Sequence, residues 1–325
     1  MEWQVWKSSQ QFRTFRMQRQ NHNAVSKLVF SSSSCRGWDA RPLTARAQPG
    51  DDGDVAASNL VAFPADYVVA VKQAQKAAEA ALEDEKRLIE IEFPTSELSA
   101  VAGDAEGANE MTLSSNYLRQ FTRMFMEEAE VTRIFFPDDK EMEMQRGENG
   151  TWEATKFQLD YLTSPSGLLD IGVDISNYDP VSHIRESDEY FIAAYPSFDP
   201  RELVAADKVW QFAKGKQKAV IFFNAELDRL RSNYYPGIFY PNMARLSRDM
   251  IPQVESVYYI HNFKGSQGGI LFRAYPGPWQ VMLRLQDGGT KVVHVQDDRP
   301  TLKSVALEIL PNASREYAMR ENKRA

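Results

Sequence analysis

Carboxylate and amide side chains recur directly after several apolar runs of this 325-residue chain. They follow runs that end near residues 136, 195 and 223, and they are Asp138, Asp139, Ser197, Asp199, Asn224 and Glu226. Oxygen donors of this kind suit Mg²⁺ or a polar ligand. Because open α/β sheets bind ligands at the carboxyl ends of parallel strands, this set is the candidate ligand cleft. A structural alternative stays open, with Asp199 as a helix cap and Asn224 and Asp138 as turn formers.

Sequence motifs of the common catalytic sites do not occur in the chain. It contains no G-x-x-x-x-G-K-[ST], no G-x-G-x-x-G between a strand and a helix, no G-x-S-x-G and no H-E-x-x-H. The glycine-rich stretch 264–269 joins two predicted strands and is interpreted as a hairpin loop. His261 and His294 fall in predicted strands of one meander, so the two could meet, while His183 is isolated. Ordinary strand histidines are favoured over a metal site, and neither a catalytic residue nor a cofactor is predicted.

Aromatic residues interleaved with proline are concentrated in the C-terminal half. Strand residues alternate between the two faces of a sheet, so the core is expected to hold most of them and the surface about a third. Exposed aromatic residues are typical of protein-binding surfaces. The candidates for partner binding are Tyr240, Tyr259, Arg273, Tyr275 and Trp279, which are equally explained as determinants of the fold.

Helices and strands must alternate to position these residues. Apolar periodicity predicts helices at 64–87, 114–129 and 200–214, the second of them capped by Ser114 or Ser115. Strands are predicted at 87–93, 132–136, 168–175, 190–195 and 218–223, with an edge strand within 152–162. Asp199, Pro200 and Glu202 form a capping-box arrangement, which makes 190–223 a βαβ unit with parallel strands.

The C-terminal part has a different pattern. Strands at 257–263, 270–275, 279–285 and 291–295 are separated by glycine and proline turns, which predicts an antiparallel meander. An amphipathic helix at 301–310 follows. The predicted fold is therefore α/β, a mostly parallel, Rossmann-like sheet flanked by helices and extended by the meander. It forms a single domain at 61–312, followed by a C-terminal tail at 313–325.

Residues 1–48 differ in composition from the rest of the chain. They contain eight Lys or Arg, two acids and seven serines, which is typical of an organelle transit peptide, and a linker is predicted at 49–60. Plastid and mitochondrial import are not separated by composition, and a basic tail that is retained is the alternative. Subtracting this segment from totals of 38 basic and 45 acidic residues leaves 30 and 43, a formal net charge of −13. A net charge this negative on residues 49–325 argues against nucleic-acid binding, which needs a basic surface.

The sequence also argues against cysteine chemistry and against a membrane-spanning helix. The only cysteine, Cys35, lies in the predicted transit peptide, so the mature body would have no disulfide and no thiol nucleophile. No stretch approaches the roughly 18 consecutive apolar residues that a membrane-spanning helix needs.

Seven short motifs, in order along the chain, resemble those of a plant and cyanobacterial family with a domain of unknown biochemical function. This is the family of the plastid Low Photosystem II Accumulation 3 protein, and the resemblance covers about residues 60–310. The motifs are Phe63-Pro64, Gln73-Ala74, 89–94 (IEIEFP), 135–138 (FFPD), 194–196 (AYP), 222–227 (FFNAEL) and 272–280 (FRAYPGPWQ).

The resemblance implies a plastid location, in the stroma and in part associated with the thylakoid. It also implies a role in photosystem II assembly, namely incorporation of the inner-antenna chlorophyll-binding subunit. Expected partners are that subunit, other assembly factors and the thylakoid insertase, with peripheral membrane association. The leading hypothesis is thus a non-enzymatic assembly factor. The alternative is a nucleotide- or metal-binding protein, conceivably an enzyme, that uses the carboxyl-edge residues.

Overall fold

The computed structural model describes residues 60–94, 98, 107–147, 152, 155–164, 178–197, 199–232, 234–264, 268–285 and 288–322. All of them belong to one compact unit, Asp54–Ala325. The predicted transit peptide, the linker up to residue 59 and the predicted strand at 168–175 lie outside the described residues.

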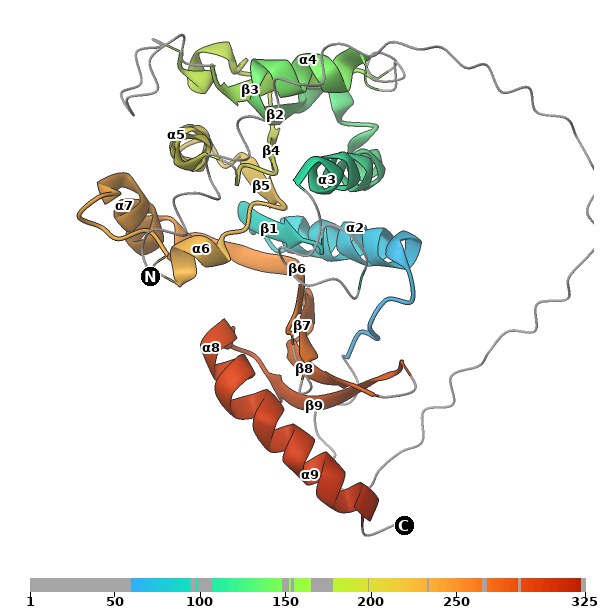
Figure 1. Ribbon diagram of the computed structural model, residues 1–325. Coiled ribbons are helices and arrows are strands. Elements are labelled where there is room, and N and C mark those ends of the chain that lie inside the picture. Colours follow the sequence, from blue (N-terminus) through green and yellow to red (C-terminus); the bar gives the residue numbers. More distant parts are fainter. Residues whose placement is uncertain are drawn as a thin grey trace, which may run out of the picture. The chain divides into compact units, whose positions relative to one another are not determined.

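A nine-stranded sheet in the order β3-β2-β4-β5-β1-β6-β7-β8-β9 organises this unit (Figure 1). The first six strands in that order are parallel, and the remaining pairings are antiparallel. The predicted α/β fold with a C-terminal meander is therefore confirmed. The strands are β1 (Leu88–Glu92), β2 (Thr132–Asp138), β3 (Gln158–Thr163), β4 (Tyr190–Ala194), β5 (Ala219–Phe223), β6 (Glu255–Asn262), β7 (Gly269–Ala274), β8 (Trp279–Arg284) and β9 (Thr290–Gln296).

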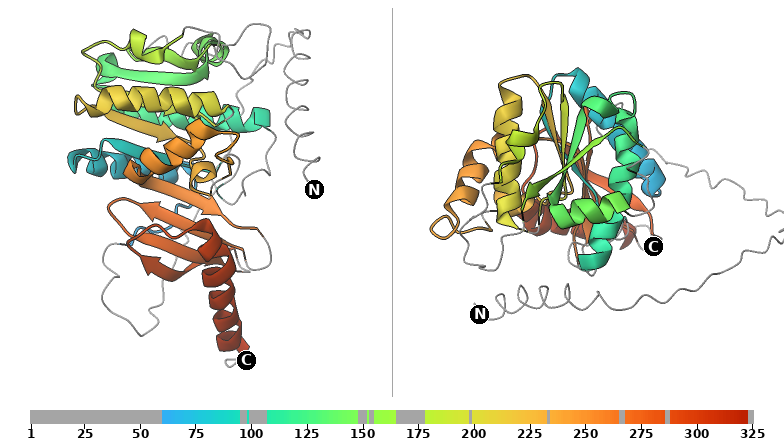
Figure 2. Two further views of the ribbon diagram at one scale, coloured as in Figure 1. Left: turned by 90° about the vertical axis from the view of Figure 1, so that its left-hand side faces the viewer. Right: turned by 90° about the horizontal axis from the view of Figure 1, so that it is seen from above.

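Helices cover both faces of the parallel part of the sheet (Figure 2). The first layer packs on Ile89, Ile91 and the residues that share their face, and it consists of α2 (Tyr67–Glu83), α3 (Gly107–Phe121) and α4 (Asp139–Gly147). The second layer packs on the opposite face with Leu88 and Val220, and it consists of α5 (Pro200–Lys214), α6 (Asp228–Arg231) and α7 (Pro241–Asp249). Because both faces are covered, β5 is a run of five buried apolar residues.

Short 3₁₀ turns occupy several of the connections. They lie at Thr122–Phe125, Ala129–Val131, Pro180–His183 and Ile251–Gln253. As predicted, β3 is the edge strand next to β2, and β4 and β5 pair in parallel around α5. The meander consists of the four predicted strands, β6 to β9, and its first strand also joins the parallel part, because β6 pairs in parallel with β1 and antiparallel with β7.

The last helices cover the second face of the meander. They are α8 (Leu302–Ser304), a π-helical turn at Val305–Ile309, and α9 (Leu310–Asn322). Val305 and Leu310 are buried against Leu271, Val281 and Leu283. The π-helical turn ends two residues before Pro311, whose missing N–H disrupts regular α-helical hydrogen bonding. The helical run thus continues through 313–322, which the sequence assigns to a tail.

Two local predictions of capping have different outcomes. Asp199 caps α5, since its side chain accepts from the backbone N–H of Arg201, and Pro200 occupies the first helical position. Ser114 and Ser115, in contrast, do not cap α3, which begins at Gly107; both serines are buried in the middle of that helix. None of the helices in the described part of the chain has the length and apolar character needed to cross a membrane.

Candidate functional site

The carboxyl ends of β2 and β4 are the place where an open α/β sheet is expected to bind a ligand. The chain leaves β2 towards β3 and leaves β4 towards β5, which lie in opposite directions in the sheet. A buried polar network fills this position. Tyr195 Oη donates to Glu141 Oε1 at 3.0 Å, and Gln145 Nε2 donates to the same oxygen at 2.9 Å. Ser115 and Arg119 donate to Gln145 Oε1.

This network holds α3, α4 and the end of β4 together. Tyr195 is 2% exposed and Glu141 is 0% exposed, so both polar groups depend on each other rather than on water. Burial, followed by the adjacent Glu141 carboxylate, raises the pKa of Tyr195 well above its ordinary value, which keeps the phenol protonated as a donor. The network therefore has a structural role, because it fixes α3, α4 and the end of β4 relative to one another.

Two of the predicted acidic residues at this edge, Asp138 and Asp199, have local partners, whereas the buried Oδ1 of Asp139 has no hydrogen-bond partner among the described residues. Asp138 Oδ1 accepts from the backbone N–H of Glu141 at 2.8 Å, at the start of α4, where Asp139 is the first residue. Asp199 Oδ1 accepts from Arg201 N at 2.9 Å, and its other oxygen accepts from Arg201 Nη2 at 2.7 Å. These contacts agree with the structural alternative, in which the aspartates stabilise helix starts.

Asn224 connects β5 to two other elements. Its backbone has a φ of +49°, a conformation that asparagine tolerates better than most residues. Its Oδ1 accepts from Phe93 N at 2.9 Å, just beyond β1, and its Nδ2 donates to Ser114 Oγ at 3.0 Å on α3. Both ends of this buried amide are therefore used to join β5 to β1 and to α3.

Arg229 brings two of the predicted residues together. Its Nη1 donates to the carbonyl oxygen of Ser197 at 2.8 Å, and its guanidinium forms an ion pair with Glu226. Glu226 also has a positive φ of 49°. The described contacts thus join Ser197 to Glu226, but they place Asp138 and Asp199 at two separate helix starts and Asn224 between β1 and α3.

Two glutamates of β1 are additional charged residues at this edge. Strand alternation places Glu90 and Glu92 on the face covered by α6, a signal already visible in the alternating sequence at 89–92. The pKa of Glu92 is raised well above its ordinary value, first by burial and then by Glu90, Glu226 and Asp228. A raised carboxyl pKa is a feature of acid–base catalysts. Glu92, however, is not among the residues that line the pocket described below.

Glu90 is the centre of a buried ion-pair network. Arg231 binds both of its oxygens, at 2.9 and 2.8 Å, and Arg299 Nη1 lies 3.3 Å from Oε2. Ser256 donates to the same carboxylate at 2.5 Å. Burial opposes ionisation, but the two arginines outweigh it and lower the pKa of Glu90 to about 2. The network joins β1, α6, β6 and the segment before α8.

Four of the five predicted partner-binding residues belong to this C-terminal region. Tyr259 and Trp279 are 0% and 1% exposed, and Arg299 lies over both rings at 4.2 and 4.7 Å from their centroids. Arg273 lies 5.3 Å from the Trp279 ring, and its Nη1 contacts Glu255 at 2.6 Å. Tyr275 is partly exposed and donates to Asp84 Oδ2 at 2.7 Å. Tyr259 and Trp279 are therefore core residues.

The fifth, Tyr240, belongs to a very different segment, which we call the aromatic loop and define as residues 234–240. It joins α6 to α7, and its side chains are unusually exposed: Ile238 by 92%, Phe239 by 78%, Tyr234 by 61% and Tyr240 by 43%. The backbone N–H groups of Phe239 and Tyr240 both donate to Pro236 O, at 3.0 and 2.9 Å. The exposed tip is therefore held in a defined turn.

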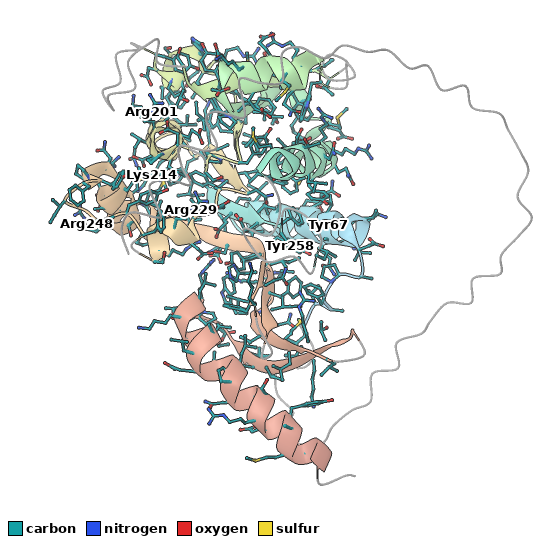
Figure 3. All side chains as sticks on the ribbon, viewed as in Figure 1. Tyr67, Arg201, Lys214, Arg229, Arg248 and Tyr258 are labelled. Atoms are coloured by element: carbon teal, nitrogen blue, oxygen red, sulfur yellow. The ribbon has the colours of Figure 1, made fainter. Side chains whose placement is uncertain are left out.

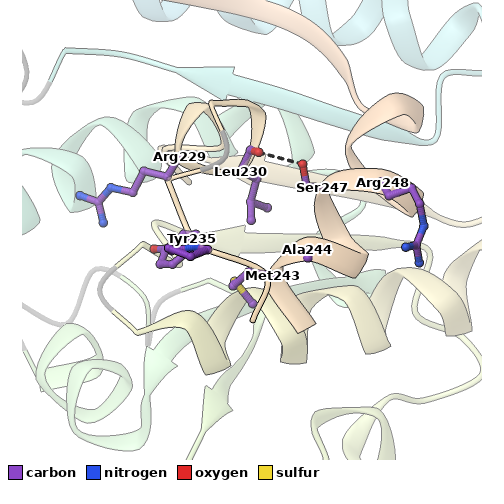
Figure 4. Close-up of a pocket in the computed structure, with 9 residues that line it drawn as sticks. Arg229, Leu230, Tyr235, Met243, Ala244, Ser247 and Arg248 are labelled. Atoms are coloured by element: carbon purple, nitrogen blue, oxygen red, sulfur yellow. Dashed lines mark hydrogen bonds between the residues drawn. The ribbon is translucent and has the colours of Figure 1, made fainter. Parts of the chain in front are cut away.

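A pocket of about 370 Å³ lies at the base of the aromatic loop, between α6 and α7 (Figure 4). Arg229 and Arg248 stand at its two ends, and Tyr235, Met243 and Ala244 lie between them. Ser247 Oγ donates to Leu230 O at 2.8 Å, which fixes α7 to α6. This pocket was not among the predicted sites, although Pro241 followed by Met243 and Leu246 was a signal for a short helix.

The histidines do not form a common site. His261 is on β6 and His294 on β9, and β7 and β8 lie between these strands, so the expectation that the two could meet is wrong. His183 Nδ1 instead lies 3.2 Å from Asp160 Oδ1. Within the described ranges, no group of three or more His, Cys, Asp and Glu side chains is arranged to hold a metal ion.

The fold and the site define an α/β protein with a central parallel sheet, in which the predicted ligand edge is occupied by structural contacts and an aromatic loop is exposed. The chain belongs to the DUF1995 family, whose model is described as a domain of unknown function and matches residues 64–307. The match begins just before α2 and ends in the π-helical turn. Searches of curated proteins and of solved structures found no match.

Proposed function

We propose that this protein is a plastid assembly factor, related to Low Photosystem II Accumulation 3, that assists photosystem II biogenesis by docking at the thylakoid surface. The basic, serine-rich N-terminal segment supports the plastid location. The motif resemblance supports the pathway, and its motifs occupy β1, the end of β2, the β5–α6 connection and the β7–β8 turn.

The exposed aromatic loop is the observation that carries a docking role. Four large side chains of one seven-residue segment are between 43% and 92% exposed. Exposed apolar groups that cluster in this way are characteristic of surfaces that bind another component. Three of the carboxyl-edge residues, Asp138, Asp199 and Asn224, are engaged in capping and bridging contacts instead of facing a common cleft.

The alternative function, nucleotide or metal binding, requires Asp138, Asn224 and Glu226 to face one cleft. The structure gives each of them a separate local partner: the start of α4, the junction of β1 with α3, and Arg229.

A null mutant tests the proposed function. We expect a selective loss of photosystem II core subunits, above all of the inner-antenna subunit, with photosystem I retained, in immunoblots and pulse-labelling of thylakoids. Reintroduction of the full chain should restore the photosystem II level. A null mutant with a normal photosystem II level and normal synthesis of its subunits would refute the proposal.

A further inference from the structure

The aromatic loop has a layered distribution of polarity. Its tip is apolar, with Ile238 and Phe239 exposed by 92% and 78%. Three tyrosines flank the tip: Tyr235 lies against Tyr234 at a ring distance of 5.1 Å and against Tyr240 at 5.4 Å. Tyrosine combines an apolar ring with a polar hydroxyl, and it is enriched where membrane proteins cross from hydrocarbon to water.

Basic side chains form the base of the loop. Residues 229–248 contain four arginines and neither Asp nor Glu, in a body whose formal net charge is −13. Figure 3 shows Arg229 and Arg248 in the same helix layer as Arg201 and Lys214 of α5, away from Tyr67 and Tyr258. The side chain of Arg248 is 73% exposed and that of Arg229 42%.

These arginines also have carboxylate partners. Arg229 pairs with Glu226, and Arg248 pairs with Asp249 at 2.7 Å. The exposed pair of Arg248 contributes little free energy, so exchange of its carboxylate for a lipid phosphate has a small cost. Arg229 can exchange Glu226 in the same way while its Nη1 continues to donate to Ser197 O. Arg231 differs, because it is held by the buried Glu90 and is part of the core.

We propose that the aromatic loop inserts into one leaflet of a lipid bilayer. Ile238 and Phe239 enter the hydrocarbon, the tyrosines lie at the interface, and Arg229 and Arg248 reach the headgroups. From the tip to the base of the loop, the groups are apolar, then aromatic, then cationic. A bilayer offers the matching regions from its centre outwards, namely the hydrocarbon, the interface and the phosphate headgroups. The turn fixed by Pro236 presents the tip without a large loss of backbone entropy on binding.

This mode of attachment is compatible with the absence of a membrane-spanning helix from the described part of the chain, since an inserted loop lies on one side of the bilayer. The inference goes beyond the proposed function, because insertion into lipid requires no photosystem partner. It leaves the remaining surface of the protein available to other components.

Flotation of the full chain with neutral phosphatidylcholine vesicles is the first test. Neutral lipid is chosen because the basic segment at 1–48 would bind anionic lipid on its own. We expect the parent chain to bind and the double variant Ile238→Ser/Phe239→Ser to bind at least about tenfold more weakly, because two apolar side chains no longer enter hydrocarbon. Met319→Ser, which removes a side chain that is 65% exposed on α9, is the matched control and should bind like the parent.

Depth of insertion is the second test. In a Cys35→Ser background, a polarity-sensitive fluorophore is attached at Ile238→Cys or, as the control, at Met319→Cys. We expect a blue shift, and quenching by lipids brominated in the acyl chain, at position 238 only. Three outcomes would overturn the inference: equal behaviour of the two labels, failure of the parent chain to bind vesicles, or unchanged vesicle binding by the double variant. The loop would then be assigned to binding a protein partner.

The outcomes also separate this inference from the proposed function. Vesicle binding that depends on Ile238 and Phe239, together with normal photosystem II in a null mutant, would support insertion and refute the assembly role. A photosystem II defect in the null mutant, together with absent vesicle binding, would refute insertion and support the assembly role. Thermal melting of the double variant should match the parent, which confirms that any loss of binding is local.

Discussion

Two segments of similar composition have opposite environments in this protein. Residues 234–241 read YYPGIFYP and residues 272–279 read FRAYPGPW, so both combine aromatic side chains with proline and glycine. In the first segment, Ile238 is 92% exposed and Phe239 78%. In the second segment, Phe272 and Trp279 are 0% and 1% exposed.

The difference lies in what covers each segment. The second segment joins β7 to β8 within the sheet, and side chains from distant parts of the chain close over it, among them Arg299 before α8. The first segment leads into α7 in the second helix layer. The described side chains around it leave its tip, Ile238 and Phe239, exposed. Local composition therefore identifies aromatic segments, while the fold decides which of them is core and which is surface.

Removal of Trp279 should have the largest effect. Trp279→Ala deletes a side chain that packs on Tyr259, Arg273 and Arg299, and we expect a loss of about 4 kcal/mol in the free energy of unfolding. Denaturant unfolding followed by circular dichroism measures it. Tyr240→Ala, in the aromatic loop, is the comparison and should cost less than about 1 kcal/mol. Similar losses in both variants would contradict the contrast.

Neutralisation of Glu90 should have the next largest effect. Glu90→Gln keeps the volume but leaves Arg231 and Arg299 without their shared carboxylate, which should lower the free energy of unfolding by about 3 kcal/mol at pH 7. Unfolding in urea provides the measurement.

The same variant predicts a pH dependence. Because the folded-state pKa of Glu90 is lowered to about 2, its contribution is fully present above the unfolded value near 4.5 and is lost as the pH falls through about 2. The parent chain should therefore lose more stability than Glu90→Gln between pH 4.5 and pH 2. Parallel stability curves for the two proteins across this interval would show that the network contributes nothing.

A methyl group at Gly237 tests whether the aromatic loop packs closely against α7. Its Cβ would lie 3.2 Å from Ala244 Cβ on α7, so the loop has to shift slightly, and Gly237→Ala should cost about 1 kcal/mol. Gly215→Ala is the control, since no atom lies within 4 Å of the added methyl group, and it should be neutral to within about 0.5 kcal/mol. A neutral Gly237→Ala would mean that the loop is not held against α7.

Polar substitution at the tip of the loop should have the smallest effect on stability. Phe239→Ser should change the free energy of unfolding by less than about 0.5 kcal/mol, because the ring is 78% exposed. Phe272→Ser, at the fully buried ring of the other segment, should cost several kcal/mol by the same measurement. A larger loss in the free energy of unfolding for Phe239→Ser would show that the ring packs against other side chains in solution.

Elements with a strong local signal were predictable from the sequence. The capping arrangement at Asp199 and the apolar run of β5 specify α5 and its neighbouring strands, because both signals act within a few residues. The start of α3 at Gly107 was missed because Ser114 and Ser115 resemble caps, although their hydroxyls bond to side chains of distant elements. Helix α7 was missed because it has only nine residues, although the spacing of Met243 and Leu246 after Pro241 is that of a short helix.

The candidate site was less predictable, because its contacts are long-range. Arg231 and Arg299 reach Glu90 across 141 and 209 residues of sequence, and no local pattern indicates which arginine will meet which acid. The carboxyl-edge residues lie at or shortly after the ends of β2, β4 and β5. Their capping and bridging roles depend on neighbours that only the assembled sheet provides.

The central position of β1 has a consequence for biosynthesis. The strand pairs on one side with β5 and on the other with β6, and Leu88 is matched with Val220, so the first of its partners follows about 130 residues later. At a translation rate of about 5–20 residues per second, β1 waits roughly 7 to 26 seconds for the first of them. During that time a strand with three apolar side chains and two unpaired edges is accessible to chaperones and to other nascent chains.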